Sequence, residues 1–430
     1  MKIAICGLIK SENIGEQFIA KSLEYLIETE CKKSCSDMSL EFVEVDLLCR
    51  NDVIVKAKSR YEAKLKNYYG YSSKGIFSDF FFLGLKIISR KLKHQGIKNF
   101  IERIRHFIWK HGRNYRKRMN QFFEMKFKDV DFIVVDGAGL LEYSYNEYQW
   151  SLLLVSEYAE KKKIPVVYNA IGRAGEFNEK DFRSTILKKA LQSDSVKYVS
   201  ARDSVKTVQV CAGVEKKVKL LADAAFWLKE TYNFEINRDR RKIGIGLIRG
   251  NSLSGYGVEF EEEDWLTLFS EIAKELARKG YEYEFFTNGL PDDVKLGKKI
   301  LTNLNLSDSY LVLRPERDLE LYSTINQYQA IITCRMHSSI AAFTLEIPSI
   351  ILSWNDKVDK LMEIIGYPQR AIKLNDFNAE YIVDTMEKAL EDGVDKKKLD
   401  KMKEKARESV SDYTGLILSQ YKKLSEKNIY

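Results

Sequence analysis

Short apolar runs alternate with amphipathic stretches along the first half of the chain. Residues 2–6 form an apolar run typical of a buried strand, and Ile19, Leu23 and Ile27 of segment 16–27 fall on one face of a predicted helix. Further strands are predicted at 41–47, 131–135, 164–170, 198–201 and 219–221, and further helices at 152–161 and 204–211. Strands separated by helices favour right-handed crossovers and a parallel sheet.

The same alternation starts again after a polar interruption. Segment 233–242 has little apolar periodicity and carries three arginines, so it is predicted to be an interdomain linker. An amphipathic helix is predicted at 262–279, and 376–430 is helical and charged. Strands are predicted at 243–248, 283–286, 310–313, 330–333 and 349–352.

These patterns predict an α/β fold made of two Rossmann-like open parallel-sheet domains. A chain of 430 residues is too long for one compact core and suits two domains. The predicted boundaries are an N-terminal domain at 1–232, a linker at 233–242, a C-terminal domain at 243–390 and a helical tail at 391–430. The arrangement matches the glycosyltransferase-B type, in which ligands bind in a cleft beyond the carboxyl ends of the strands.

Segment 56–128 interrupts the first domain where a short crossover is expected. It mixes aromatic residues with many cations and few acids, and is predicted to be a helical insertion. The basic series is Lys86, Arg90, Lys91, Lys93, Arg103, Arg105, Lys110, Arg113, Arg116, Lys117 and Arg118. One interpretation is an insertion packed on its own domain with a solvated basic face; another is contact with an anionic membrane surface through 77–118. Nucleic acid is disfavoured because no recognised binding module is present.

The overall composition restricts the partners and the compartment. A net charge of +8 and a pI near 8.8 are compatible with anionic ligands. The six cysteines are scattered and, like the four histidines, lack metal-site spacing, so neither disulfides nor a metal is expected. The chain opens without a secretory signal pattern and has no apolar run long enough to span a bilayer. We expect a cytoplasmic protein, with peripheral attachment at the inner face of the membrane left open.

The segment richest in chemistry is 333–343, where a predicted strand turns sharply into a helix. Ser338 is predicted to cap that helix. Arg335 stands beside the positive helix end, where it can bind an oxyanion, and His337 is the single histidine outside the insertion. We expect His337 to act as a general acid or base. The alternative is a loop arginine and a loop histidine satisfied by nearby carbonyls.

A second segment, 346–357, is predicted to be a strand that ends in a polar loop. Trp354 could stack on a sugar ring, and Asp356 or Lys357 could contact polar groups. The alternative is that Lys357 opens the next helix and stays in solvent.

Both segments carry a family resemblance. Arg-x-His-Ser at 335–338, an alanine-rich helix, an Ile-Pro strand and an Asp-Lys loop closely resemble the polysaccharide pyruvyl transferase family. Segment 13–16 looks like its Asn-x-Gly-Asp loop with Glu in place of Asp, and 136–141 like its glycine-rich loop with two glycines replaced. Segment 200–204 looks like its Arg-Asp-Ser turn, and 222–226 like its Asp-Pro-Ala-Phe segment without the proline.

The resemblance implies transfer of the carboxyvinyl unit of phosphoenolpyruvate to a sugar, forming a pyruvate ketal, with no cofactor. Phosphoenolpyruvate carries a phosphate and a carboxylate, so its site needs more than one cation. Arg335 and Arg202 are the matched candidates, Arg249 is a third, and Ser338 is also expected to bind phosphoenolpyruvate. His337 is the implied acid and base, with Glu16 or Asp356 as an optional carboxylate partner.

Acceptor contacts are expected from the loops at the strand ends. The candidates are Asn13, Gly15, Glu16, Gly137, Gly139, Trp354, Asp356 and Lys357. Asp223 is interpreted as a helix cap or an interface residue, without a chemical role.

Three functions stay open at this point. The first is a pyruvyl transferase acting on a cell-surface polysaccharide or its lipid-linked precursor. The second is a nucleotide-sugar-dependent glycosyltransferase, for which Glu316 and Glu320 are the available acidic ribose ligands. The third is a non-catalytic relative that binds glycans.

Overall fold

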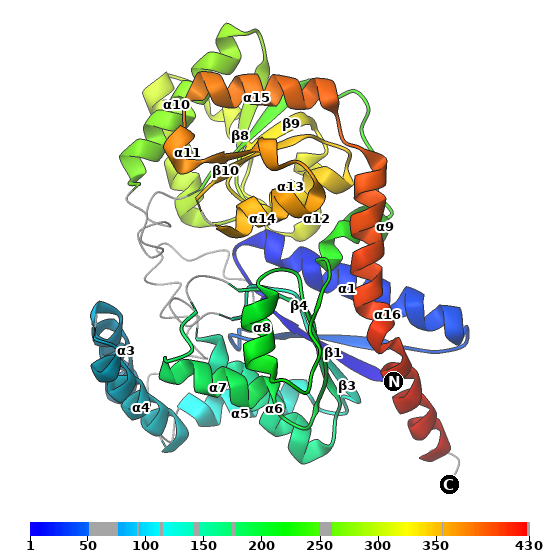
Figure 1. Ribbon diagram of the computed structural model, residues 1–430. Helices are drawn as coiled ribbons and strands as arrows, with labels where there is room; N and C mark the ends of the chain where they lie inside the picture. Colours follow the sequence, from blue (N-terminus) through cyan, green and yellow to red (C-terminus); the bar gives the residue numbers. More distant parts are fainter. Residues whose placement is uncertain are drawn as a thin grey trace. The chain divides into compact units, whose positions relative to one another are not determined.

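The computed structural model describes residues 1–50, 76–92, 94–111, 115–141, 147–173, 177–248, 260–354 and 356–427 (Figure 1). The chain divides into two compact units. Unit 1 comprises Met1–Lys10, Ile27–Leu221 and Ser409–Tyr430, and unit 2 comprises Ser11–Leu26 and Ala222–Glu408. Segment Ser11–Leu26 therefore packs with unit 2, although it directly follows the first strand of unit 1.

Unit 1 is built on a six-stranded sheet with the order β2-β1-β3-β4-β5-β6. All its strand pairs are parallel. The strands are β1 (Lys2–Gly7), β2 (Glu41–Asp46), β3 (Phe132–Val135), β4 (Val166–Ile171), β5 (Val196–Ala201) and β6 (Lys219–Leu220). Strands β3 and β4 are buried throughout, which explains their continuous apolar sequences.

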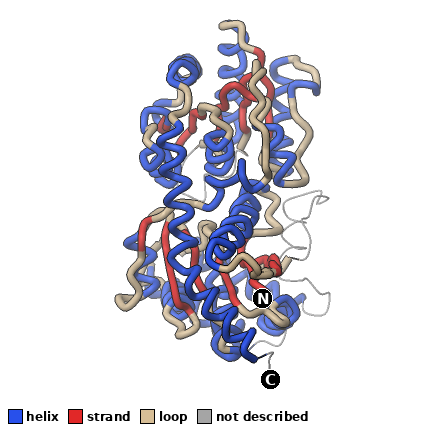
Figure 2. The backbone as a smooth tube through the Cα atoms, turned by 90° about the vertical axis from the view of Figure 1, so that its right-hand side faces the viewer, coloured by secondary structure: helices blue, strands red, loops and turns tan. Residues whose placement is uncertain are grey.

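Helices of unit 1 pack against its sheet and against one another (Figure 2). They are α3 (Ile76–Lys91), α4 (Gln95–His111), α5 (Tyr115–Lys126), α6 (Tyr148–Lys162), α7 (Phe182–Leu191) and α8 (Val205–Ala212). Helices α1 (Gln17–Ser34) and α16 (Lys396–Lys427) contribute residues to both units. No helix in the described part of the chain is long and apolar enough to cross a bilayer.

The described part of the insertion, from residue 76 onward, is mainly helical, as predicted, but its basic residues are not all solvated. Lys86 and Arg105 are buried, 5% and 0% exposed. Arg105 forms ion pairs with Glu102 and Glu147, and Lys86 Nζ lies 3.3 Å from Glu147 Oε2. A solvated basic face is therefore wrong for these two residues, because carboxylates of the same unit neutralise them inside the protein.

Unit 2 is built on a five-stranded parallel sheet with the order β11-β10-β9-β7-β8. The strands are β7 (Lys242–Gly246), β8 (Glu282–Phe286), β9 (Tyr328–Thr333), β10 (Ser349–Ser353) and β11 (Ala371–Lys373). From β7 the chain passes to β8 on one side and then to β9 on the other. The topological switch point therefore lies between β7 and β9, and ligands of such sheets bind beyond the carboxyl ends there.

Helices and short 3₁₀ segments cover this second sheet. The α-helices are α9 (Leu228–Thr231), α10 (Glu262–Arg278), α11 (Pro291–Leu304), α12 (Asp318–Ile325), α13 (Met336–Thr344), α14 (Asp356–Ile365) and α15 (Ala379–Asp392). The 3₁₀ segments are η1 (Ile14–Glu16), η3 (Ala224–Trp227), η6 (Asp308–Tyr310), η7 (Pro368–Arg370) and η8 (Leu374–Asp376).

One predicted strand is wrong and one strand was not predicted. Segment 310–313 is the end of η6 followed by an isolated bridge between Leu311 and Phe285. Leu313 is 90% exposed, so the segment lacks the buried face that would extend the pairing. The short strand β11 was not predicted.

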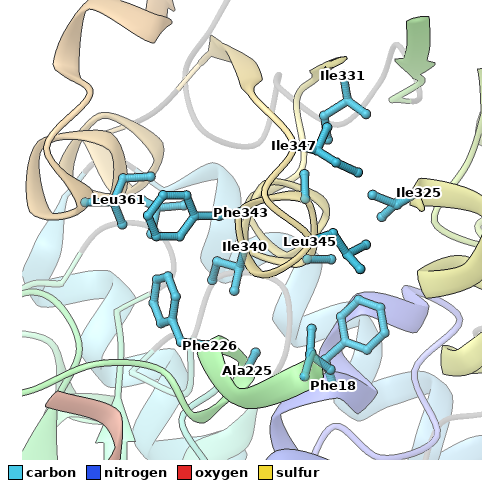
Figure 3. Packing of buried hydrophobic residues seen from close by; sticks show 14 of the residues in the cluster. Phe18, Ala225, Phe226, Ile325, Ile331, Ile340, Phe343, Leu345, Ile347 and Leu361 are labelled. Carbon is cyan, nitrogen blue, oxygen red and sulfur yellow. The ribbon is translucent and has the colours of Figure 1, made fainter. Parts of the chain in front are cut away.

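The apolar face of α13 is held in the core of unit 2 (Figure 3). Phe343 meets Phe226 of η3 edge to face with 6.1 Å between ring centroids, and Ile340 belongs to the same cluster. This packing fixes the helix whose first turn carries His337. The two open parallel sheets, the helical insertion and the helical tail confirm the predicted fold class.

Candidate functional site

The turn from β9 into α13 places His337 at the carboxyl end of a strand beside the switch point. The backbone N–H of Arg335 donates to Thr333 Oγ1 at 3.1 Å, and α13 begins at Met336. The predicted capping role of Ser338 is wrong, because the N-cap of α13 is Arg335, three residues earlier. Ser338 lies in the first turn instead, and its Oγ donates to Asn288 Oδ1 at 2.7 Å.

The His337 ring lies between two carboxylates. Its Nε2 is 3.5 Å from Asp223 Oδ2, and its Nδ1 is 3.7 Å from Glu16 Oε1. His337 is 3% exposed, so these contacts are largely shielded from water. Contact with Glu16 was one of the two options from the sequence.

The two carboxylates are held differently. Asp223 is 2% exposed and caps η3, with Oδ1 accepting from the Ala225 N–H at 3.0 Å. Glu16 is more exposed, with 18% of its side chain accessible, and its Oε1 also accepts from Asn13 Nδ2 at 3.3 Å. Asp223 is therefore the fixed partner of the ring and Glu16 the adjustable one. The contact of Asp223 with His337 was not predicted, and the one available signal was an acid just after the short strand at 219–221.

The loop that carries Asn13 and Glu16 is fastened against the His337 turn. The Ile14 N–H donates to the Asn288 carbonyl at 2.8 Å. A Cβ on Gly15 would stand 2.7 Å from His337 Cβ and 3.2 Å from Asn288 Nδ2. Glycine at position 15 is thus required by close packing against His337.

Arg335 forms an ion pair with a buried residue of unit 2. Its Nη2 lies 2.6 Å from Asp293 Oδ2, and Asp293, in α11, is fully buried. The Arg335 side chain is 14% exposed, and its Nε is buried with no hydrogen-bond partner in the described chain. Asn288 Nδ2 likewise has no hydrogen-bond partner among the described residues. These two donors, one in the turn into α13 and one in the loop after β8, suit an anionic oxygen.

Other predicted residues of unit 2 lie near the same strand ends. Trp354 follows β10, and its Nε1 donates to the Cys334 carbonyl at 3.3 Å, so its indole is tied to the residue before Arg335. Helix α14 begins at Asp356. The side chains of Asp356 and Lys357, and the whole of Arg249 after β7, lie outside the described residues.

The remaining predicted residues belong to unit 1. Arg202 follows β5, is 6% exposed, and its Nε lies 3.7 Å from Asp203 Oδ2. A Cβ on Gly137 would stand 2.8 Å from the Ala170 carbonyl oxygen, so glycine allows the backbone of β4 to pass close by. Gly139 is buried. These three follow β3 and β5 at the carboxyl edge of the first sheet.

Side chains that commonly bind metals occur throughout the described part of the protein. No group of three or more His, Cys, Asp or Glu side chains there could hold a metal ion. The candidate site therefore consists of an imidazole, two carboxylates, a guanidinium and amide donors.

Comparison with known proteins assigns the chain to a family. The model of the family described as polysaccharide pyruvyl transferase matches residues 46–356. The match includes Asp223 and the turn 335–338, but leaves out the loop 13–16. No curated protein shows significant sequence similarity to the chain.

Solved structures give the fold alone. S. aureus MnaA in a co-structure with UDP is 10% identical with a TM-score of 0.50, covering 97% of this chain and 97% of that chain. UDP-GlcNAc 2-epimerase from Neisseria meningitidis, bound to UDP-GlcNAc, is 12% identical with a TM-score of 0.51, covering 98% of this chain and 100% of that chain. These neighbours agree with the predicted glycosyltransferase-B-like fold class.

Proposed function

Because the chain belongs to the polysaccharide pyruvyl transferase family, we propose that it transfers the carboxyvinyl group of phosphoenolpyruvate to a sugar. The product is a pyruvate ketal on two hydroxyls, and inorganic phosphate leaves. The acceptor is a sugar of a cell-surface polysaccharide or of its lipid-linked precursor. The observation that carries the proposal is the buried His337 ring held between Asp223 and Glu16 at the start of α13.

The anionic donor is assigned to the start of α13. Arg335 Nε and Asn288 Nδ2 are buried donors with no hydrogen-bond partner in the described residues, and the helix N-terminus adds its partial positive charge. Ser338 braces Asn288 through its hydroxyl. Arg202 and Arg249 are further proposed cations for the phosphate or the carboxylate.

The reaction requires proton transfer in both directions. The methylene carbon of phosphoenolpyruvate gains a proton while a sugar hydroxyl attacks the adjacent carbon and loses one. Phosphate then departs, and the second hydroxyl closes the ketal and releases the proton that phosphate takes away. A single imidazole can give the first proton and accept one from a hydroxyl.

Nδ1 of His337 is proposed as the nitrogen that faces the substrate. Asp223 is buried and held by the Ala225 N–H, so it can keep the ring oriented and stabilise its charged form through Nε2. Glu16 is the more exposed of the two carboxylates and lies 3.7 Å from Nδ1, so a substrate can displace it. Asn13, Glu16 and Trp354 are proposed to contact the acceptor. Gly15, Gly137, Gly139, Asp356 and Lys357 remain proposed acceptor positions.

The direct test uses the purified full-length chain with phosphoenolpyruvate and candidate acceptors. We expect phosphate release that depends on the acceptor, and a product heavier by one pyruvate less one water. His337→Ala should abolish both signals while the protein stays folded. His94→Ala, at an exposed histidine of the insertion, should keep full activity and serves as the matched control. Full turnover by His337→Ala would reject the assigned role.

A parallel reaction tests the glycosyltransferase alternative. The same protein is incubated with UDP-sugars and acceptors in the absence of phosphoenolpyruvate. Release of UDP with sugar transfer would replace the proposed reaction. Acceptor binding without turnover of either donor would favour a glycan-binding relative.

A further inference from the structure

Helix α4 buries charged side chains and exposes several large apolar ones. Its buried residues are Glu102, Arg105 and Trp109, two of which are charged. On the outside, Ile97, Phe100 and Phe107 are 50%, 63% and 64% exposed. Residues 97, 100 and 107 follow helical spacing, so these side chains form one outward stripe.

Buried charges prevent this helix from turning its apolar side inward. Arg105 Nη1 lies 2.8 Å from Glu102 Oε2, and Arg105 Nη2 pairs with Glu147 from the loop before α6. Separating such pairs leaves an uncompensated charge in the protein interior, which strongly destabilises the fold. The outward position of Phe100 and Phe107 is therefore imposed by the ion pairs on the opposite side.

Helix α3 carries further exposed apolar side chains. It packs against α4 and lies beside it in Figure 1. Phe81, Ile87 and Ile88 of α3 are 59%, 57% and 50% exposed, while Lys86 and Ser89 are buried. We call the six exposed side chains, Phe81, Ile87, Ile88, Ile97, Phe100 and Phe107, the α3–α4 apolar face. Single exposed apolar residues are ordinary, but six on two adjacent helices indicate an interaction surface.

Cations border this face. Lys91, Arg103 and Lys110 are exposed on the same two helices. Between 81 and 111 the single acid is Glu102, which is buried against Arg105. A second copy of the chain would bring the same cations to the contact and be repelled. An anionic lipid surface supplies both complements, phosphates for the cations and acyl chains for the aromatic rings.

We propose that the α3–α4 apolar face docks on the surface of an anionic lipid bilayer. Phe100 and Phe107 enter the boundary between headgroups and acyl chains, and Arg103 and Lys110 contact lipid phosphates. The inference does not depend on the reaction that the site performs, and it would bring the enzyme to a lipid-linked acceptor if the proposed function holds.

Vesicle flotation of the full chain tests the proposal. We expect binding to phosphatidylcholine vesicles containing about one third phosphatidylglycerol, and much weaker binding to pure phosphatidylcholine. The double variant Phe100→Ser/Phe107→Ser should lower the partition coefficient by about tenfold or more. Arg103→Glu/Lys110→Glu should remove the preference for anionic vesicles. Leu313→Ser, at a residue of unit 2 that is 90% exposed, is the matched control and should bind like the parent.

Two controls separate the result from folding and from catalysis. Each variant should keep the parent unfolding midpoint and its turnover of a soluble acceptor. If the phenylalanine variant fails to fold, the charge variant still decides the question. Absence of vesicle binding, or binding insensitive to lipid charge and to both variants, would overturn the proposal. Self-association that Phe100→Ser/Phe107→Ser abolishes, without vesicle binding, would overturn it in favour of contact between copies.

Discussion

His337 Nε2 lies 3.5 Å from Asp223 Oδ2, and the other oxygen of this carboxylate accepts a hydrogen bond from the Ala225 N–H. Asp223 thus performs two tasks with two oxygens: Oδ1 caps η3, and Oδ2 faces the imidazole. Since Asp223 is 2% exposed, its position is set by the protein and not by solvent. This relationship makes the side chain of Asp223 a positioning group for the proposed acid and base.

Asp223→Asn should lower kcat by about 100-fold or more, because an amide cannot stabilise the imidazolium as a carboxylate does. The cap on η3 should survive, since the amide oxygen still accepts from Ala225, and the unfolding midpoint should change little. The readout is the pH dependence of kcat, which should change in shape in the variant. A variant with parental kcat and pH profile would remove Asp223 from the mechanism.

Gly15→Ala should reduce activity, because the added Cβ would stand 2.7 Å from His337 Cβ and must push the ring or the loop aside. Overpacking of this kind typically costs about 1–3 kcal/mol. Gly415→Ala is the matched control, since nothing lies within 4 Å of the added Cβ there. It should stabilise α16 by about 0.5–1 kcal/mol and leave turnover unchanged. Denaturant unfolding with steady-state kinetics distinguishes the two, and a fully active Gly15→Ala would contradict the close packing.

Arg335→Ala should destabilise unit 2 as well as abolish activity. The substitution breaks the ion pair that Arg335 Nη2 makes at 2.6 Å with the fully buried Asp293, and breaking a buried ion pair typically costs about 3–5 kcal/mol. Adding Asp293→Asn should restore much of the stability and none of the activity. Chemical denaturation and phosphate release measured on the same samples check both parts. Recovery of turnover in the double variant would show that Arg335 is structural and does not bind the donor.

Unit 1 should lose stability in acid through Glu147. Burial by itself would raise the pKa of this carboxyl, but the charges of Arg105 and Lys86 outweigh burial and lower its pKa from 4.5 to about 2. A depressed folded-state pKa stabilises the protein above about pH 4.5, and the contribution disappears as the pH falls from there towards 2. The shift corresponds to about 3 kcal/mol.

Glu147→Gln checks this assignment. The variant should be less stable than the parent at neutral pH, because Arg105 and Lys86 lose a buried counter-charge, and its stability should depend less on pH between 4.5 and 2. Urea unfolding at several pH values measures both effects. Parallel stability curves for parent and variant over that interval would disprove the role of Glu147 in the acid transition.

The local pattern of apolar and polar residues was sufficient to predict most of the strands and helices. The strands at the starts of both sheets and the long helix at 262–279 follow from runs of apolar residues, since burial against a sheet imposes its period on the sequence. The motif at 335–338 was visible in the sequence because the turn that carries Arg and His is one contiguous segment. The strand predicted at 310–313 failed because edge pairing depends on neighbours that a local pattern does not contain.

The amino-acid sequence by itself determined the two α/β sheets, the helical insertion and the placement of His337 at a strand end, because these depend on residues close together in the chain. The tertiary structure alone decided which carboxylates flank His337, that Ser11–Leu26 packs with unit 2, and that Lys86 and Arg105 are internal. Each of these depends on contacts between distant segments, where the desolvation of a charge is compensated by whichever partner the fold brings within a few ångströms.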